Sequence, residues 1–403
     1  MWATIWNTGV QVGGKVTTGL LGLVATMLLT RGLGVEHYGQ LSLITAFLVF
    51  LDTLADFGTR LIGVREMAKN QEGVWSQMVW LRVITTGLAF GLGVVVIGWW
   101  PGFEGVRGEA IVAIMMVWLT MLAGNLEMVW QAKLRMGMKV MGEVLFSVLI
   151  LVFLYLFRIE INLMLVMEIY LIARILSLVV ATGWLNKLTG VSRIEKWQKD
   201  DLGRLWREVW PMGVYLLIFA AYDRVVDSLM IERFLGIREV AWYGLAYKMY
   251  AVLIMPAYFL MGSVFPLLAK GGNNKEAEKK VRWLLMAGAI GVILVVELLA
   301  PIMVAIMGGD SYWPTIGVLR GLMVALFFAY NNHWLGFKLI ARGEQKLVLK
   351  AGLVALTVNF VGNLWAIPRF GIMGAVAVTG LTELVSSVVL MGRDKNTEIR
   401  NKR

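Results

Sequence analysis

Residues 283–307 read WLLMAGAIGVILVVELLAPIMVAIM, and this stretch decides the fold class. Glu297 is its single charged residue. A helix that crosses a bilayer needs about 20 consecutive apolar residues, so the stretch predicts one membrane span. The whole chain has the same character, because 59% of its 403 residues are hydrophobic and 16% are charged. Soluble domains carry about 25% charged residues, and the composition therefore excludes a soluble protein.

Twelve apolar runs of this kind follow one another along the chain. They cover residues 9–30, 38–62, 75–100, 110–131, 140–157, 161–185, 209–231, 240–268, 283–307, 315–340, 347–367 and 372–391. Hydrophobic residues in these runs do not alternate with period two, which disfavours a transmembrane β-barrel. We therefore expect an all-α polytopic membrane protein with about 12 transmembrane helices.

The net charge is +11, and the positions of the Lys and Arg residues along the chain indicate how it is oriented in the membrane. The intervals on the side of the two termini hold 24 of the 38 Lys and Arg residues, the opposite intervals hold six, and eight lie inside the apolar runs. Lys and Arg concentrate in cytoplasmic loops, so both termini are predicted to be cytoplasmic. Because orientation explains most of the basic excess, no nucleic-acid partner is expected. With no Cys and two His, no metal site or disulfide is expected either.

Two similar turns mark the halves of the chain. Leu33-Gly34 with Tyr38-Gly39 follows the first run, and Leu235-Gly236 with Tyr243-Gly244 follows the seventh. Six helices in each half give the halves the same orientation, and parallel repeats of this kind place a transporter's substrate site near the midplane at the repeat interface. The predicted organisation is a six-helix lobe over 1–185, a cytoplasmic linker over 186–208, a second lobe over 209–392 and a basic cytoplasmic tail over 393–403.

Charged residues inside the apolar runs are the candidate functional residues. The clustered ones are Lys15, Asp52, Asp56, Arg60, Asp223, Arg224, Asp227 and Lys248. Asp52, Asp56 and Arg60 are spaced by four residues, which places them on one face of a helix. Charges in a bilayer are costly and usually mark a substrate or ion pathway. Ion pairs that hold helices together are the alternative interpretation.

Other charges in the runs are isolated along the chain. They are Glu168, Arg174, Glu297, Arg320, Lys338 and Glu383, for which helix pairing or snorkelling is expected rather than ligand contact. Arg82 lies near a predicted cytoplasmic helix end, where its guanidinium is expected to snorkel.

The residues around these charges resemble a known family. The resembling positions are Arg31–Gly39 (RGLGVEHYG), Asp56-Phe57-Gly58, Arg65-Glu66, Asp227, Leu235-Gly236, Tyr243, Ala246-Tyr247-Lys248, Phe265-Pro266, Asn359, Asn363, Ile367-Pro368, Gly371, Gly374-Ala375, Ala377, Thr379 and Glu383. In this order they are similar to polysaccharide flippases of the O-antigen type, which act on lipid-linked oligosaccharides. These flippases form one branch of the multidrug/oligosaccharidyl-lipid/polysaccharide (MOP) exporter superfamily. One departure is Val376, where a third small residue is common.

The resemblance implies a V-shaped two-lobe bundle that moves polyprenyl-(pyro)phosphate-linked oligosaccharide from the inner to the outer leaflet by alternating access. It implies a cationic substrate cavity at Lys15, Arg60, Arg224 and Lys248. It also implies coupling to H⁺ or Na⁺, for which Asp56 and Asp227, with Asp52 and Asp223 beside them, are candidate carboxylates. No other cofactor is expected. The polysaccharide-assembly enzymes are candidate protein partners, a monomer is favoured, and the expected location is the cytoplasmic (inner) membrane.

Two other functions stay open from the sequence. An H⁺- or Na⁺-coupled multidrug exporter of the same superfamily would share the helices, and the near balance of buried acids and bases does not discriminate against it. A membrane glycan polymerase or glycosyltransferase would handle similar lipids. Such an enzyme typically needs a large external loop, whereas the external intervals here span about ten residues or fewer. A transporter, rather than an enzyme, is therefore predicted.

Overall fold

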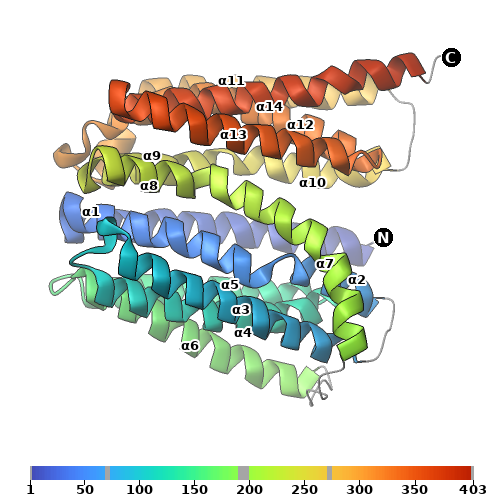
Figure 1. The fold of residues 1–403 in the computed structure, drawn as a ribbon, viewed down its shortest axis with the longest axis horizontal. Helices are drawn as coiled ribbons and strands as arrows, with labels where there is room; N and C mark the ends of the chain where they lie inside the picture. Colours follow the sequence, from blue (N-terminus) through green and yellow to red (C-terminus); the bar gives the residue numbers. More distant parts are fainter. Residues whose placement is uncertain (1, 69–72, 189–198, 270–274, 401–403) are drawn as a thin grey trace. The chain divides into compact units, whose positions relative to one another are not determined.

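Helices account for all twelve predicted spans (Figure 1). The computed structural model describes residues 2–68, 73–188, 199–269 and 275–400. Within these ranges it does not describe the side chains of residues 2–8, 184–188, 199–201, 223–224, 266–267, 269, 275, 277 and 393–400. Over the described ranges every regular element is helical. The hydrocarbon core of a bilayer offers no water to pair with backbone N–H and C=O groups, and a helix pairs these groups within itself. The prediction of an all-α polytopic protein is confirmed.

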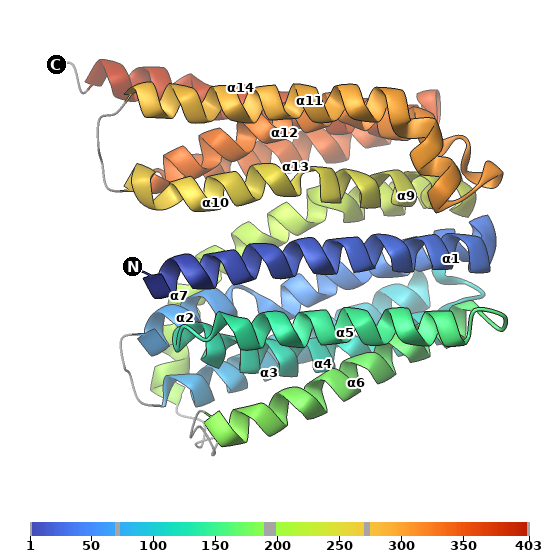
Figure 2. The same ribbon diagram turned by 180° about the vertical axis from the view of Figure 1, so that it is seen from behind.

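The chain divides into two units, Met1–Ala220 and Ala221–Arg403. The helices of the first unit are α1 (Trp2–Asp56), α2 (Thr59–Ala68), α3 (Val74–Trp99), α4 (Arg107–Ala132), α5 (Met136–Leu156), α6 (Leu163–Leu188) and α7 (Lys199–Ala220). Within this unit α1 packs along α5 and α3, and α4 packs along α6 and α3 (Figure 2). The helix α7 packs on α1, α2 and α3 of the same unit.

The described residues of the second unit also form helices. It begins with one π-helical turn, Ala221–Val225, followed by α8 (Val226–Phe234), α9 (Ile237–Leu253), α10 (Met255–Ala269), α11 (Lys275–Met307), α12 (Thr315–Ala341), α13 (Gln345–Phe370) and α14 (Ile372–Arg400). Here α14 packs between α12 and α13, and α12 also contacts α9, α10 and α11. Short 3₁₀ turns precede α4 (Pro101–Phe103) and α12 (Asp310–Tyr312).

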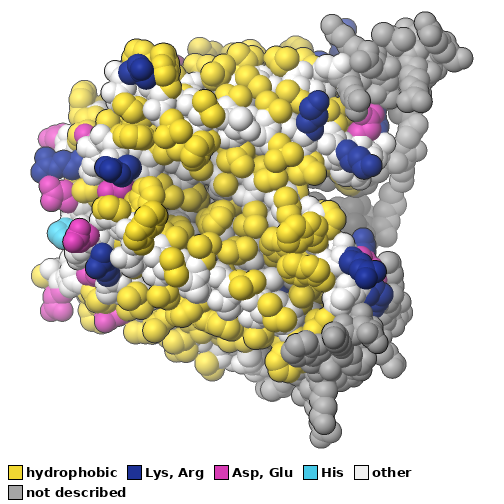
Figure 3. Space-filling model, viewed as in Figure 1, with side chains coloured by type: hydrophobic (Ala, Val, Ile, Leu, Met, Phe, Trp, Pro, Cys, Tyr) yellow, Lys and Arg dark blue, Asp and Glu magenta, His cyan; other side chains and the backbone are white. Residues whose placement is uncertain are grey.

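Nine helical stretches among the described residues are long and apolar enough to cross a membrane. One of them, Gly9–Ala68, holds the first two predicted spans. The predicted span 209–231 is interrupted by the π-helical turn, and 315–340 carries Asn331, Asn332 and His333. On the face shown in Figure 3, hydrophobic side chains cover the middle of the helices and most charged side chains lie toward their ends. The chain is a multi-pass membrane protein, whereas the side on which its termini lie stays a prediction.

Backbone breaks lie at the predicted turns. Gly34 has φ 71° and ψ 179° inside α1, and Gly236 has φ 119° before α9. Glycine adopts positive φ without steric cost, so both similar Leu-Gly turns use the same conformational freedom.

A second break separates the predicted triad of charges. Phe57 and Gly58, with φ 40° and 76°, end α1 after Asp56, so Arg60 lies on α2. The expectation of one continuous helical face for Asp52, Asp56 and Arg60 is therefore wrong. The Phe57 ring lies against α7, stacked on Trp206 with ring centroids 5.4 Å apart, and Gly213 lies close to the same ring. Packing of the Phe57 ring against α7 thus stabilises the backbone conformation of Phe57 and Gly58 between α1 and α2.

The unit boundary coincides with the π-helical turn. A π-helical turn inserts an extra residue into a helix and often marks a functional site. Because α7 packs within the first unit, residues 209–220 group with that unit in the structure. The predicted lobes 1–185 and 209–392, the linker 186–208 and the tail 393–403 stay predictions, and residues 189–198 of that linker and 401–403 of that tail lie outside the described residues.

Candidate functional site

Charged side chains from five helices surround a cavity of about 300 Å³ inside the first unit. The charged lining residues are Asp52 and Asp56 of α1, Arg60 of α2, Arg82 of α3, Glu127 of α4 and Arg174 of α6. Three carboxylates face three guanidinium groups, so their formal charges cancel. The cavity therefore presents both acceptors and donors to a ligand, rather than a purely cationic wall.

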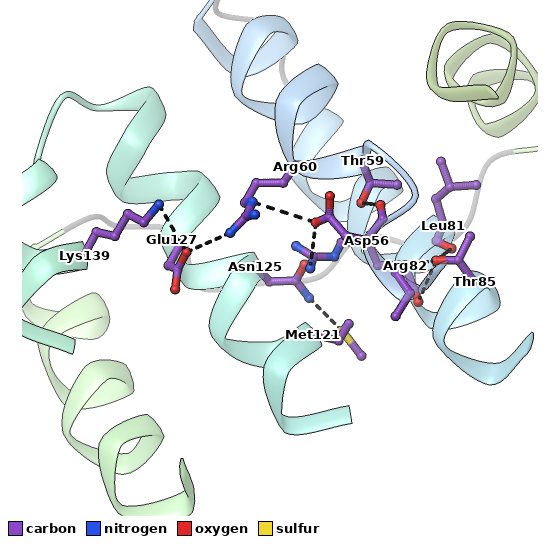
Figure 4. Close-up of polar contacts among 11 residues, drawn as sticks. Asp56, Thr59, Arg60, Leu81, Arg82, Thr85, Met121, Asn125, Glu127 and Lys139 are labelled. Carbon is purple, nitrogen blue, oxygen red and sulfur yellow. Dashed lines mark hydrogen bonds and ion pairs between the residues drawn. The ribbon is translucent and has the colours of Figure 1, made fainter. Parts of the chain in front are cut away.

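Asp56 is the centre of one ion-pair group (Figure 4). Its Oδ1 lies 3.2 Å from Arg82 Nη2 and 3.8 Å from Arg60 Nε. Arg82 is 3% exposed, so the expectation that its side chain snorkels to the helix end is wrong. The guanidinium instead turns inward because the Asp56 carboxylate offsets the cost of burying it.

Glu127 continues this network into α5. Its Oε2 accepts a hydrogen bond from Arg60 Nη1 at 3.1 Å and lies 3.6 Å from Lys139 Nζ. Lys139 also lies 3.8 Å from Glu143, one helical turn further along α5. The ion pairs therefore link α1, α2, α3, α4 and α5 (Figure 4).

Some polar atoms in this cavity are buried without a hydrogen bond among the described residues. They are Asp52 Oδ1, Asp56 Oδ1, Arg82 Nε and Nη1, and Arg174 Nε, and of these Asp56 Oδ1 takes part in the ion pairs with Arg82 and Arg60. Arg174 stacks over the Phe146 ring, with its guanidinium carbon 3.7 Å from the ring centroid, and it interacts electrostatically with Asp52. Buried donors and acceptors are normally paired, so these atoms are the ones a bound ligand would satisfy.

Lys15 belongs to the edge of the same charged region. It lies on α1 with an exposed side chain, and it interacts electrostatically with Glu143, Lys139 and Arg60. The structure thus brings two of the predicted cationic residues, Lys15 and Arg60, into one region of the first unit. Arg82, Glu127 and Arg174 join them there, although no spacing along the chain groups these residues.

Asp227 forms a separate polar site inside the second unit, where it is fully buried. Its Oδ1 accepts hydrogen bonds from the side-chain amides of Asn359 at 2.9 Å and Asn363 at 2.6 Å. Its Oδ2 accepts from the hydroxyls of Tyr243 and of Thr379, the latter at 3.3 Å. One carboxylate therefore ties α8 to α9, α13 and α14 through four neutral donors.

Sequence reasoning placed these partners in the resembling stretches without assigning them to Asp227. Asn359 and Asn363 are spaced by four residues in the apolar run 347–367. Such a polar pair inside an apolar segment is the feature of the sequence that could have indicated a buried polar site on this helix. A site shared by α8, α9, α13 and α14 depends on packing, which spacing along one helix does not predict.

The remaining predicted residues belong to the second unit. Lys248 is half-buried on α9. The side chains of Asp223 and Arg224 lie outside the described residues, and their backbone forms the π-helical turn. The cationic cavity of Lys15, Arg60, Arg224 and Lys248 and the coupling roles of the four aspartates stay predictions.

Several solved structures of membrane transporters have a similar fold. A multidrug resistance MATE-family transporter of the MOP superfamily, in an inward-facing conformation, matches with a TM-score of 0.75 at 15% identity, covering 95% of this chain and 96% of that one. The lipid II flippase MurJ, in an inward closed conformation, matches with a TM-score of 0.78 at 13% identity, covering 95% and 86%. The MATE multidrug transporter DinF-BH matches with a TM-score of 0.68 at 16% identity, covering 98% and 96%. At these identities the matches show the fold.

The family comes from the sequence itself. No curated protein sequence matches the chain. The family model described as polysaccharide biosynthesis protein matches residues 5–271, which is more than half of the chain. The chain therefore belongs to the polysaccharide biosynthesis protein family and has the fold of the MOP-superfamily transporters.

Proposed function

We propose that this protein is a flippase for polyprenyl-(pyro)phosphate-linked oligosaccharide, which it moves from the cytoplasmic to the outer leaflet of the cytoplasmic membrane by alternating access. The observation that carries the proposal is the set of buried guanidinium donors beside the cavity of the first unit that no described residue accepts, in a chain of the polysaccharide biosynthesis family. The prenyl chain stays in lipid, and only the polar head requires a protein environment.

The chemistry of the head group fits these donors. A phosphate group crossing about 30 Å of hydrocarbon needs paired charges and hydrogen bonds along its way. Arginine binds phosphate oxygens through two parallel N–H donors, and Arg82 and Arg174 offer N–H groups that no described residue accepts. Sugar hydroxyls both donate and accept, so the Asp52 carboxylate suits the saccharide part. We assign the head group to this cavity, with Lys15 at its edge.

Energy for directional transport has two sources in this proposal. Outward movement of a negative head group gains about 2.3 kcal/mol per charge for each 100 mV when the cytoplasm is negative. Return of the empty carrier is coupled to H⁺ or Na⁺, and the buried Asp227 carboxylate is the coupling group that we favour. Its four hydrogen-bond donors are neutral, so no fixed positive charge competes with a cation for this carboxylate.

Reconstituted vesicles test the head-group assignment. The probe is a fluorescent polyprenyl-diphosphate oligosaccharide, and its transfer is read from the fraction accessible to an impermeant oxidant. We expect R82Q with R174Q to lower the initial rate strongly, and neutralisation of Lys15, Arg224 and Lys248 together to abolish flipping. The matched control is R158Q, because Arg158 is exposed at a helix end over Tyr155. Unchanged rates in the cavity variants would remove the assignment.

The same vesicles discriminate the alternatives. Transfer of a cationic dye without transfer of the lipid would identify a multidrug exporter. A lengthened glycan on the recovered lipid would identify a polymerase or glycosyltransferase. We expect neither outcome, and we expect the monomer to be active without the polysaccharide-assembly enzymes that are its candidate partners.

A further inference from the structure

An ion pair joins α11 and α12 of the second unit. Arg320 Nε lies 3.3 Å from Glu297 Oε2, and Arg320 Nη2 donates to the backbone carbonyl of Glu297 at 2.7 Å. Helix pairing, one of the two roles expected for these isolated charges, is therefore present. The pair is nevertheless open on one side, because the side chains of Arg320 and Glu297 are 43% and 44% exposed.

The position of Glu297 places this opening inside the bilayer. The helix α11 continues for ten residues beyond Glu297 and ends at Met307, which puts Glu297 about 15 Å from the end of the helix. The hydrocarbon core is about 30 Å thick, so the carboxylate lies near its middle. The guanidinium of Arg320 turns to this carboxylate and does not snorkel to the interface.

The surroundings of the ion pair are apolar and exposed. Leu294 lies one turn before Glu297, Leu298 follows it, and Val324 lies one turn after Arg320. The side chains of all three are exposed. We call this surface of Leu294, Glu297, Leu298, Arg320 and Val324 the α11–α12 face. Beyond its own contacts with α12 and the turn that follows it, α11 makes few contacts in its unit, and it runs beside α12 (Figure 2).

Packing of two such helices does not require the charges. The third and fourth spans of the first half are α3 and α4, which also pack on each other. Residues 83–99 of α3 and 110–126 of α4 include no charged residue. An ion pair exposed to hydrocarbon is costly, and charges at this depth normally face protein or a water-filled cavity. The α11–α12 face therefore calls for a polar partner at the same depth.

We propose that a second copy of this chain binds the α11–α12 face, with Glu297 of each copy against Arg320 of the other. The proposal goes beyond the proposed function and does not depend on the substrate. The monomer expected above stays the unit that transports, because the face contains no residue of the charged cavity in the first unit.

Charge complementarity selects a second copy as the occupant. The face carries one positive and one negative group side by side. Rotation by 180° about an axis along the membrane normal keeps their depth and brings each charge against its opposite, which is the geometry of a twofold dimer. A guanidinium has five N–H donors, and the contacts to Glu297 use only Nε and Nη2 of Arg320. The other donors can reach the second carboxylate.

Glycines on the exposed sides of both helices allow another helix to approach closely. Gly288 and Gly291 on α11 and Gly317 on α12 are exposed, and a Cβ added at any of them would meet no atom within 4 Å. Small residues are typical of helix contacts in membranes, because they let the backbones come together. These glycines complement the ion pair, which remains the observation that identifies the partner.

Cross-linking tests whether two copies meet at this face. The chain has no Cys, so L298C introduces a single thiol beside Glu297. Leu298 is 78% exposed. In vesicles at low protein density, an added oxidant should link L298C copies into a disulfide dimer on a non-reducing gel. The matched control is V95C on α3, which is also exposed and should stay monomeric.

Charge reversal tests the reciprocal ion pairs. Pairing is measured by energy transfer between donor- and acceptor-labelled copies as lipid dilutes them. E297R leaves two positive groups in each face and R320E leaves two negative ones. Each variant alone should pair at least about tenfold more weakly than the unmodified chain, the scale of one interhelical polar contact in a membrane. An equimolar mixture of E297R and R320E should recover pairing, because opposite charges then meet. R369E, at an exposed arginine of α13, should pair normally.

The mixture keeps the test decisive, since a variant that misfolds cannot recover pairing with the other. The proposal is overturned if L298C links no faster than V95C, or if the mixture pairs no better than either variant alone. A cross-link of L298C only to a different membrane protein would also overturn it. Lipid transfer is not part of either readout, so these results and the proposed substrate stand or fall separately.

Discussion

Replacing Asp227 tests whether its four hydrogen bonds hold the second unit together. The comparison is between D227N and D227L, because both remove the charge while only one keeps hydrogen bonding. In D227N the new Oδ1 accepts from Asn359 and Asn363, and the new amide donates to Tyr243 and Thr379, whose hydroxyls rotate to accept. All four partners therefore stay satisfied.

In D227L the hydroxyls of Tyr243 and Thr379 still find each other and the Ala375 carbonyl, at 3.2 and 3.0 Å in the structure. The amides of Asn359 and Asn363, 1% and 0% exposed, lose their acceptor. A buried donor left without a partner costs about 1–3 kcal/mol. The free energy of unfolding of D227L should therefore lie roughly 2–6 kcal/mol below that of D227N.

Equilibrium unfolding with SDS in mixed micelles, followed by Trp fluorescence, measures this difference. The matched control is D310N against D310L, because Asp310 is exposed in the turn before α12, and that pair should unfold alike. A difference between D227N and D227L within about 0.5 kcal/mol, the effect of an ordinary surface substitution, would refute the four-partner site.

Three further outcomes follow from packing and charge. G213A places a methyl group 2.3 Å from Cδ1 of the Phe57 ring, so SDS unfolding should show a loss of about 1–3 kcal/mol, whereas G22A, with open space around it, should show none. G124A brings its methyl within 2.5 Å of Arg82 Nη2, and the guanidinium should move away from Asp56; we expect slower lipid transfer in vesicles together with a lower free energy of unfolding in SDS, and an unchanged transfer rate would contradict the role of that ion pair. A potential of 100 mV, negative on the cytoplasmic side, should shift the steady-state lipid distribution roughly 50-fold per charge carried, read from oxidant accessibility with and without a potassium gradient and valinomycin. An equal steady-state lipid distribution with and without the potential would mean that no net charge crosses the membrane during transfer.

Hydropathy alone predicted the helices, because a bilayer forces each span to be apolar over its whole length. It also predicted the turns at Gly34 and Gly236, where the Leu-Gly pairs separate apolar runs. It missed the break at Phe57-Gly58, since that break depends on α7 packing against the Phe57 ring, far away in sequence. The continuous face expected for Asp56 and Arg60 failed for that reason.

The candidate site was predicted in part. Clustering along the chain found Asp52, Asp56 and Asp227, because a helix brings residues four apart together. Arg82 and Arg174 were assigned to snorkelling or helix pairing, because nothing near them in sequence carries the opposite charge. Their partners and neighbours come from other helices of the unit, and only tertiary packing brings these together.

The lipid transfer rate of the purified, unmodified protein tests the central claim most directly. Vesicles carry the fluorescent polyprenyl-diphosphate oligosaccharide in both leaflets, and an impermeant oxidant reports how much of it becomes accessible over time. Our account predicts that the protein makes the whole lipid pool accessible, while D56N with R82Q in the same vesicles is much slower. A protected inner-leaflet pool that persists with the unmodified protein as it does in empty vesicles would contradict it.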